Sequence, residues 1–87
     1  MALVKINPTV ARVRWDRRAD RPADVRWNGR RIRVAGLDAV RDERSAYPVA
    51  RGPRVMFVLR STDGGRAALA FDPRRRRWTL EAVEDAA

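Results

Sequence analysis

The stretch ADVRWNGRRIRV, residues 23–34, has the pattern of a β-hairpin closed by a two-residue turn. Asn28-Gly29 is the preferred pair for a type I′ turn, because both turn positions need a positive φ. The turn fixes the pairs across the hairpin as Trp27–Arg30, Val25–Ile32 and Ala23–Val34 on one face, and Arg26–Arg31 and Asp24–Arg33 on the other. A slip of one residue would move every apolar side chain to the wrong face, so the apolar residues support this register. We also expect Arg30 to stack on Trp27.

A second alternating segment, VARVRW, precedes the hairpin at residues 10–15 and predicts another strand. Its apolar face would carry Ala11, Val13 and Trp15, and its polar face Arg12 and Arg14. The polar sequence DRRADRP that follows is typical of a loop. If this strand and the hairpin are neighbours, their arginines share one surface of the sheet.

The C-terminal part of the chain predicts a three-stranded meander. Residues 54–60, RVMFVLR, are nearly all apolar, as in a central strand covered on both faces. A three-residue loop at 63–65 and a four-residue loop at 73–76 would join this strand to strands 66–71 and 78–83. The two loops align two ladders of large side chains, Phe57–Phe71–Trp78 and Leu59–Leu69–Leu80.

The middle of the chain is less regular. Leu37 and Val40 are three residues apart within GLDAVRDER, residues 36–44, which indicates one or two helical turns. The next segment, SAYPVARGP, contains two prolines and a glycine and predicts a loop in which Tyr47 packs. We therefore expect one mainly β domain over residues 1–87, with an ordered core at 8–85 and frayed termini. Its five to six antiparallel strands would form a small sheet or a partly closed barrel, with at most one short helix.

Composition narrows the functional classes. The 87 residues include 20 Lys and Arg against 11 Asp and Glu, for a net charge of +9. A positive field of this size attracts nucleic acid or another polyanion. The chain has no Cys and no His, which excludes a disulfide scaffold, a zinc site built on these residues and a histidine base. No motif typical of a catalytic or cofactor site is present, so we expect no enzyme activity, no cofactor and no metal.

Arginines form two candidate binding sites. The first is the polar face of the N-terminal strand and the hairpin, with Arg12, Arg14, Arg26, Arg31 and Arg33. A phosphate between the opposed Arg26 and Arg31 would replace like-charge repulsion with charge-assisted hydrogen bonds. The second is the run Arg74, Arg75, Arg76 and Arg77, on a loop that could reach phosphates without reading sequence. The alternative in both places is a solvated surface, with Asp16 and Asp24 partly compensating the first site.

The choice of arginine has a second explanation. All but one of the 20 basic residues are Arg, and the codons for Arg, Ala, Val and Gly are GC-rich. A GC-rich genome would therefore supply Arg in place of Lys. This explains the residue type better than it explains the excess of basic over acidic residues.

Tryptophans are the remaining candidates, because Trp15, Trp27 and Trp78 could stack on bases if they were exposed. The registers place Trp27 and Trp78 on apolar faces, which favours core positions for both. Trp27 lies beside the turn and is the one that we expect to be most exposed.

The order RPADVRWNGRRIRV, an apolar strand, a glycine-bearing turn and FDPRRRRWTLEAVED resembles a family of short bacterial domains of unknown function. The matching positions are Pro22, Trp27, Gly29, Arg30, Val34, Trp78, Leu80 and Asp85. Between the two halves, where that family usually has tryptophans, this chain has LDAVRDERSAYPV. The resemblance implies a small β-rich fold and a link to DNA damage tolerance. It assigns no activity and no catalytic residue.

These observations favour a non-enzymatic nucleic-acid-binding accessory module that contacts the phosphate backbone of DNA or RNA. The alternative is a protein-interaction or scaffold module, including a homodimer formed through a sheet edge or an exposed Trp. No apolar stretch approaches the ~18 residues of a membrane span, and MALVKINPTV lacks the pattern of a signal peptide. We therefore expect a cytoplasmic protein without a membrane partner.

Overall fold

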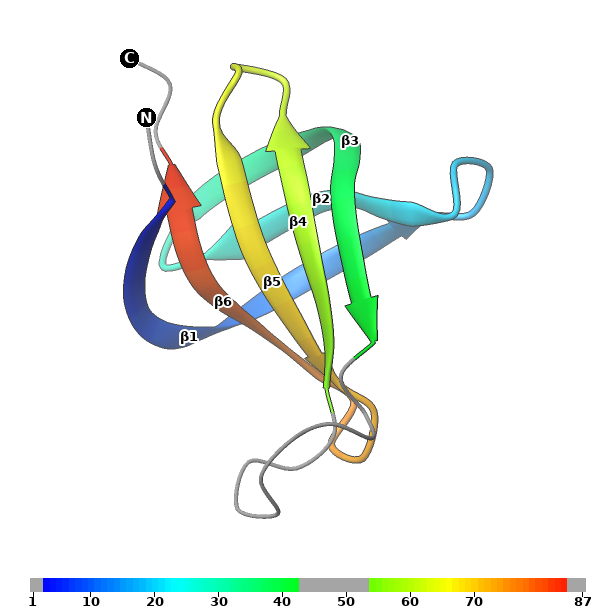
Figure 1. The fold of residues 1–87 in the computed structure, drawn as a ribbon, viewed down its shortest axis with the longest axis vertical. Helices are drawn as coiled ribbons and strands as arrows, with labels where there is room; N and C mark the ends of the chain where they lie inside the picture. The colour runs from blue at the N-terminus through cyan, green and yellow to red at the C-terminus, as the bar shows by residue number, and fades with distance from the viewer. Residues whose placement is uncertain (1–2, 43–53, 85–87) are drawn as a thin grey trace.

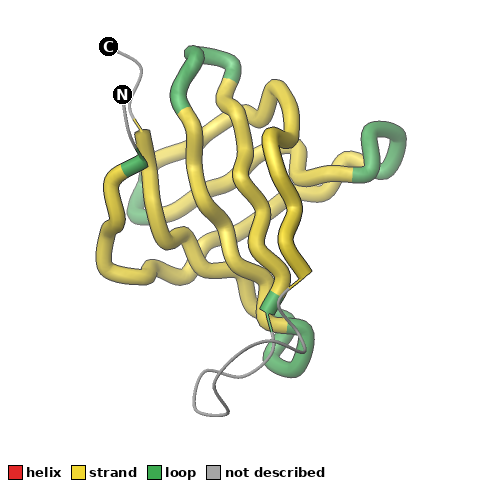
Figure 2. Tube along the Cα trace, in the orientation of Figure 1, coloured by secondary structure: helices red, strands yellow, loops and turns green. Residues whose placement is uncertain are grey.

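The computed structural model describes residues 3–42 and 54–84, which form a closed barrel of six antiparallel strands (Figures 1 and 2). The strands are β1 (Val4–Asp16), β2 (Arg21–Trp27), β3 (Arg30–Asp42), β4 (Val55–Ser61), β5 (Arg66–Asp72) and β6 (Arg77–Glu84). Each strand pairs with the next along the chain, and β1 pairs with β6 to close the barrel. The expected mainly β fold of five to six strands is confirmed, in its barrel form.

Two long strands, β1 and β3, bend and take part in both layers of the barrel. The first half of β1 pairs with β6 and its second half with β2, while β3 pairs first with β2 and then with β4. In Figure 1 the layer that contains β2 lies behind β4, β5 and β6 and crosses them at a steep angle. A register irregularity between Val34 and Gly36 accompanies the change of partner in β3, because a bulge bends a strand, and β1 has a further irregularity between Lys5 and Thr9 within its pairing with β6.

The strand β1 begins at Val4, earlier than the strand predicted from residue 10. The added residues, VKINPT, continue the alternation of apolar and polar side chains, so this part of the strand could have been predicted from periodicity. Pro8 lacks a backbone N–H and lies within the irregularity between Lys5 and Thr9, where the ladder is interrupted.

The core lies between the two layers. The side chains of Val25, Leu59, Leu69 and Leu80 are fully buried, and Trp27 and Val34 pack with them. These residues come from β2, β3, β4, β5 and β6, so the core forms only when both layers are present.

The hairpin predicted at residues 23–34 is confirmed from Asp24 to Arg33, whereas the predicted Ala23–Val34 pair is not part of this register and Val34 pairs with Ser61 of β4. Trp27 pairs with Arg30, Val25 with Ile32, and the outward pairs are Arg26–Arg31 and Asp24–Arg33. Asn28 and Gly29 have φ angles of 47° and 74°, as a type I′ turn requires. The guanidinium of Arg30 lies 5.4 Å from the centre of the Trp27 ring, which confirms the expected stacking.

The C-terminal meander is confirmed between β5 and β6 and wrong in register between β4 and β5. Phe71 pairs with Trp78 and Leu69 with Leu80, across the four-residue loop at 73–76. However, Phe57 pairs with Leu69, not with Phe71. The predicted ladders are therefore replaced by Val55–Phe71–Trp78, Phe57–Leu69–Leu80 and Leu59–Ala67–Val83.

The loop between β4 and β5 explains this error in register. The N–H of Ser61 donates to the carbonyl of Gly65, so the three loop residues are 62–64 and not 63–65. Gly64 has a φ of 94° and Asp63 accepts a hydrogen bond from the N–H of Gly65. The glycine with a positive φ is therefore Gly64, and two adjacent glycines in the sequence do not show which one takes that position.

The helix predicted at residues 36–44 is wrong as far as Asp42, because β3 continues to that residue. A register irregularity between Leu37 and Ala39 inserts an extra residue, so that Leu37 lies opposite Leu59 and Val40 opposite Phe57. Both side chains thus lie on the same face of the strand although they are three apart in sequence, which imitates helical spacing. The predicted loop with Tyr47, and the end of the predicted helix, lie outside the described residues.

The remaining strand predictions agree with the structure in position, but the strand predicted at 54–60 is not covered on both faces as expected. The apolar strand predicted at 54–60 is β4, in which Leu59 is buried and the outward-facing Met56 and Val58 are half-buried. Within residues 3–42 and 54–84, no helix is long and apolar enough to cross a membrane.

The fold predicts the effect of core truncation. Leu69→Ala removes a fully buried side chain of β5 and should lower the free energy of unfolding by about 2–5 kcal/mol. Val10→Ala truncates a side chain that is 61% exposed, and it should change the free energy of unfolding by less than about 0.5 kcal/mol. Urea denaturation followed by tryptophan fluorescence measures both, and equal losses would contradict the assigned core.

Candidate nucleic-acid interface

The five arginines of the first candidate site lie on one outer surface, across β1, β2 and β3. Arg12 pairs with Arg26, and Arg26 pairs with Arg31, so three arginines form a row across three neighbouring strands. The next row on the same face is Arg14, Asp24 and Arg33. We call these five arginines, together with Asp24, the arginine face.

A buried carboxylate holds the centre of the arginine face. The side chain of Asp24 is only 4% exposed, although it points away from the barrel core. Arg14 Nε donates to Asp24 Oδ2 at 2.9 Å and Arg31 Nη2 donates to the same oxygen at 3.4 Å. Arg26 Nε lies 3.9 Å from Asp24 Oδ1. The three guanidiniums therefore cover the carboxylate and bury it.

The charges around Asp24 determine its protonation. Burial raises the pKa of this carboxyl, but the hydrogen bond from Arg14 and the positive charges of Arg14, Arg31 and Arg26 outweigh burial. The pKa of Asp24 therefore lies below its ordinary value, and the carboxylate is ionised at neutral pH. The sequence identified Arg26 and Arg31 as a like-charge pair with Asp16 and Asp24 as partial compensation, and the structure places Asp24 against both arginines.

Two arginines of the face are not engaged with Asp24. Arg12 and Arg33 form no ion pair with any residue in the described part of the chain. They lie at opposite corners, Arg12 at the end of one row and Arg33 at the end of the next. One carboxylate among five guanidiniums leaves the arginine face strongly positive.

Two hollows border the arginine face, and both share Arg31. One, of ≈ 510 Å³, lies beside the hairpin turn and is lined by Arg12, Arg26, Arg30 and Arg31 together with Val10, Trp27, Asn28 and Gly29. The other, of ≈ 450 Å³, is lined by Arg14, Arg21, Arg31 and Arg33 together with Asp16, Ala23, Val34 and Thr62. Arg21 borders this second hollow, and its Nε is buried without a hydrogen-bond partner among the described residues.

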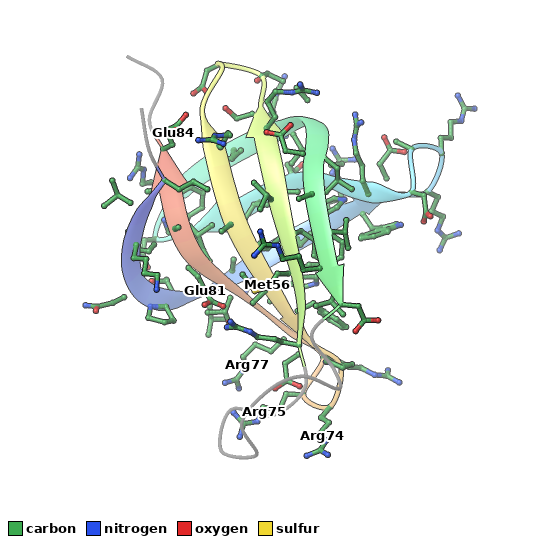
Figure 3. The ribbon with its side chains drawn as sticks, in the orientation of Figure 1. Met56, Arg74, Arg75, Arg77, Glu81 and Glu84 are labelled. Atoms are coloured by element: carbon green, nitrogen blue, oxygen red, sulfur yellow. The ribbon has the colours of Figure 1, made fainter. Side chains whose placement is uncertain are left out.

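The second candidate site, Arg74 to Arg77, lies on the loop between β5 and β6. Figure 3 shows Arg74, Arg75 and Arg77 projecting from the lower end of the barrel. Asp72 Oδ1 accepts hydrogen bonds from the backbone N–H groups of Arg74 and Arg75, at 2.9 and 3.2 Å. Arg76 has a φ of 51° and completes the turn. Backbone hydrogen bonds thus fix the loop and leave its arginine side chains exposed.

The loop between β1 and β2 has the same construction. Asp16 Oδ1 accepts from the N–H groups of Arg18 and Ala19, at 3.0 and 3.2 Å, and Asp20 has a φ of 55°. Asp16 pairs with Arg21 as Asp72 pairs with Arg77. The shared sequence pattern is Asp-x-Arg-x-x-Arg, in DRRADR and in DPRRRR. Sequence analysis identified both loops but missed this common pattern.

The two candidate sites lie on different parts of the barrel surface. Arg75 and Arg77 line a third hollow, of ≈ 740 Å³, on the outer face of β5 and β6, where Met56 and Glu81 also lie (Figure 3). Val10 borders both this hollow and the one at the hairpin turn. The two sites are therefore separate patches that approach each other along β1.

The tryptophans differ from expectation in two respects, although Trp27 does occupy the predicted core position. Trp27 is 8% exposed and belongs to the core, so the prediction that it is the most exposed tryptophan is wrong. Trp15 is 40% exposed, although periodicity assigned it to the apolar face with Ala11 and Val13. A register irregularity between Arg14 and Trp15, beyond the last residue of β1 paired with β6, explains the difference. Trp78 is half-buried.

No group of His, Cys, Asp and Glu side chains within residues 3–42 and 54–84 is arranged to hold a metal ion. No family model matches the chain, and neither does any curated protein or solved structure to which it was compared. The resemblance to a family of short bacterial domains therefore stays a prediction.

The geometry around Asp24 predicts a specific stability effect. Asp24→Asn removes the charge shared by three guanidiniums and should lower the free energy of unfolding at neutral pH by about 1–3 kcal/mol. Asp20→Asn is the matched control, because Asp20 is exposed and Asn tolerates its positive φ. Urea denaturation of both variants measures the difference; a loss in Asp20→Asn as large as in Asp24→Asn would contradict the role of Asp24.

The same carboxyl predicts a pH dependence. A carboxyl whose pKa is lower in the folded state stabilises the fold above its unfolded value, 3.8 for Asp24, and loses this contribution as pH falls through the folded value. Hydrogen bonds from Ser61 to Asp63 and from Arg66 to Glu84 lower the pKa of these carboxyls as well. The free energy of unfolding should therefore fall below about pH 4, and less steeply in Asp24→Asn. Parallel profiles for the two proteins in acid denaturation would refute the assignment to Asp24.

Proposed function

We propose that this protein is a non-enzymatic nucleic-acid-binding module that contacts the phosphate backbone through the arginine face. The observation that carries the proposal is the alignment of five arginines on three neighbouring strands around one carboxylate. Neighbouring strands lie about 4.8 Å apart, so the row Arg12–Arg26–Arg31 extends over about 10 Å. A polyanion with regularly spaced charges can contact several of these guanidiniums at once.

The contacts to Asp24 support a phosphate as the ligand. Arg14 and Arg31 each donate one N–H to a carboxylate oxygen, which leaves other N–H groups of the same planar guanidinium directed elsewhere. Guanidinium groups bind phosphate oxygens in the same charge-assisted geometry. Asp24 thus holds arginines in place while most of their donors stay available to a phosphate.

The hollow beside Arg14 and Arg33 adds a second kind of support, because Arg21 and Arg31 line it as well. A phosphate in this hollow would meet several guanidiniums at once. The exposed arginines are long and carry no rigid neighbour that would select a base, so we propose binding that is independent of sequence.

Closure of the barrel limits the ways in which the alternative, a protein-interaction module, could bind a partner. Each of the six strands pairs with two neighbours, so the described part of the barrel leaves only short free edges for a sheet-edge dimer, such as β1 beyond Ala11. A partner protein would contact either such a short edge or the side chains of the outer surface. Sedimentation of the free protein tests for such a dimer.

A salt series tests the proposed function. Arg12→Gln with Arg33→Gln removes two arginines that form no ion pair with described residues, so Asp24 keeps its partners. Binding to a short DNA duplex should weaken, and the log–log salt slope should become shallower by about 0.9 for each phosphate that the variant no longer neutralises. Fluorescence anisotropy with a labelled duplex measures both quantities.

A second double variant controls for net charge. Arg41→Gln with Arg60→Gln removes the same charge from the outer surface of β3 and β4, away from the arginine face. This control variant should retain more of the wild-type affinity and of the wild-type salt slope than Arg12→Gln with Arg33→Gln does. Equal losses in the two double variants would reject the arginine face as the site, and no binding to DNA or RNA at low salt would reject the proposed function altogether.

A further inference from the structure

Aromatic side chains meet at one end of the barrel and are not fully covered there. The ring of Trp78 lies 4.7 Å from Phe71, 5.4 Å from Phe57 and 6.4 Å from Trp15, measured between ring centres. Val40 lies opposite Phe57 on β3 and is 52% exposed. We call these five residues, Trp15, Val40, Phe57, Phe71 and Trp78, the aromatic end of the barrel.

Trp15 is the exposed part of the aromatic end. Phe57 packs against its ring edge-to-face, with ring centres 6.3 Å apart and planes at 81°. Trp78 lies on another side of it, tilted by 33°. Two aromatic neighbours therefore fix the position of the Trp15 ring, while 40% of its surface stays open to solvent. A large aromatic ring that is both held in place and exposed is a ready stacking surface.

Two arginine-bearing loops flank this surface. Trp15 immediately precedes the loop that Asp16 organises, and Trp78 immediately follows the loop that Asp72 organises. The contact between the two tryptophan rings therefore brings the bases of the two loops together. From Asp16 to Arg21 and from Asp72 to Arg77 the loops carry seven arginines and three aspartates. The carboxylates of Asp16 and Asp72 accept hydrogen bonds from loop N–H groups.

An exposed aromatic ring between cationic loops fits a ligand that is both aromatic and anionic. The unstacked bases of a single strand offer such faces, and the adjacent phosphates offer the charge. A duplex offers the phosphates but keeps its base faces stacked inside. An apolar patch of a partner protein would leave the positive charge of the loops uncompensated.

We propose that the protein prefers single-stranded nucleic acid, with a base stacked on Trp15 and the flanking phosphates contacted by the arginines of the two loops. This inference rests on the proposed function, because it names the nucleic acid that such a module would take. It assigns to Trp15 the stacking role that the sequence suggested for Trp27, which is buried in the core.

Probes that differ only in their bases test the inference. The probes are labelled oligothymidylate, oligouridylate, an abasic oligomer and a duplex, all of about 12 units, a length within the site sizes of single-strand binders. Wild-type protein should bind oligothymidylate or oligouridylate about tenfold or more tightly than the abasic oligomer. It should also bind these single strands more tightly than the duplex at the same salt concentration. The tighter binding of either oligothymidylate or oligouridylate shows whether the protein prefers DNA or RNA.

Two substitutions at Trp15 separate stacking from folding. Trp15→Leu should lose about tenfold or more in affinity for the single strands but keep the wild-type salt slope, since it leaves every arginine that meets a phosphate in place. Trp15→Phe keeps an aromatic ring and should retain most of the affinity. Urea denaturation of both variants shows whether each is folded under the binding conditions, and a shared loss of stability with different affinities still supports stacking.

The outcomes separate this inference from the proposed function. Equal wild-type affinity for the abasic oligomer and for oligothymidylate, or unchanged affinity in folded Trp15→Leu, would overturn the inference. In that case a loss of binding in Arg12→Gln with Arg33→Gln would leave the proposed function standing. Absence of binding to every probe at low salt would overturn both.

Discussion

The change of partner along β1 is the constraint on which the rest of the structure depends. Its first half pairs with β6 and closes the barrel, and its second half pairs with β2. Ala11 is the last β1 residue paired with β6, opposite Trp78, and Arg12 is the first paired with β2. One strand therefore completes the core on one side and presents its arginines in line with those of β2 and β3 on the other.

The same departure from β6 leaves the aromatic end partly open. Beyond Ala11, β1 has no neighbour on the side where β6 lay, so Trp15 is covered by aromatic side chains and not by another strand. The ring of Trp15 packs against Phe57 and Trp78 at this end of the barrel. The contacts that cover this part of the core therefore also hold the exposed surface of Trp15 in position.

The arginine excess is organised by a few carboxylates. Asp24 fixes three arginines of the arginine face, and Asp16 and Asp72 fix the backbone of two arginine-bearing loops. In each place one acidic residue determines the geometry of several basic ones. A codon preference for arginine accounts for the residue type, whereas it does not account for the placement of these aspartates. The positive charge is therefore presented at defined positions on the barrel.

Local patterns in the sequence were sufficient for the elements whose register depends on one turn. Asn28-Gly29 fixed the β2–β3 pairs, and the four residues after Asp72 fixed the β5–β6 pairs, because a tight turn allows few alternatives. The arginine face was predictable to the same extent, since the arginines alternate along strands and only the adjacency of β1 and β2 had to be assumed. Asp24 was recognised as partial compensation because it lies two residues from Arg26 on the same face, whereas its burial beneath three guanidiniums was not predictable from the sequence.

What the sequence determined by itself was the polarity of each short strand and the turns that join β2 to β3 and β5 to β6. Only the tertiary structure decided the bulge that aligns Leu37 with Val40, the position of Gly64 in its loop and the exposure of Trp15 in place of Trp27. The bulge and the exposure of Trp15 depend on contacts between residues that are distant in sequence, and the position of Gly64 depends on which of two adjacent glycines takes the positive φ. Periodicity reports which side of a strand a residue occupies, whereas barrel closure determines which of those sides is covered and how far along the strand the cover extends.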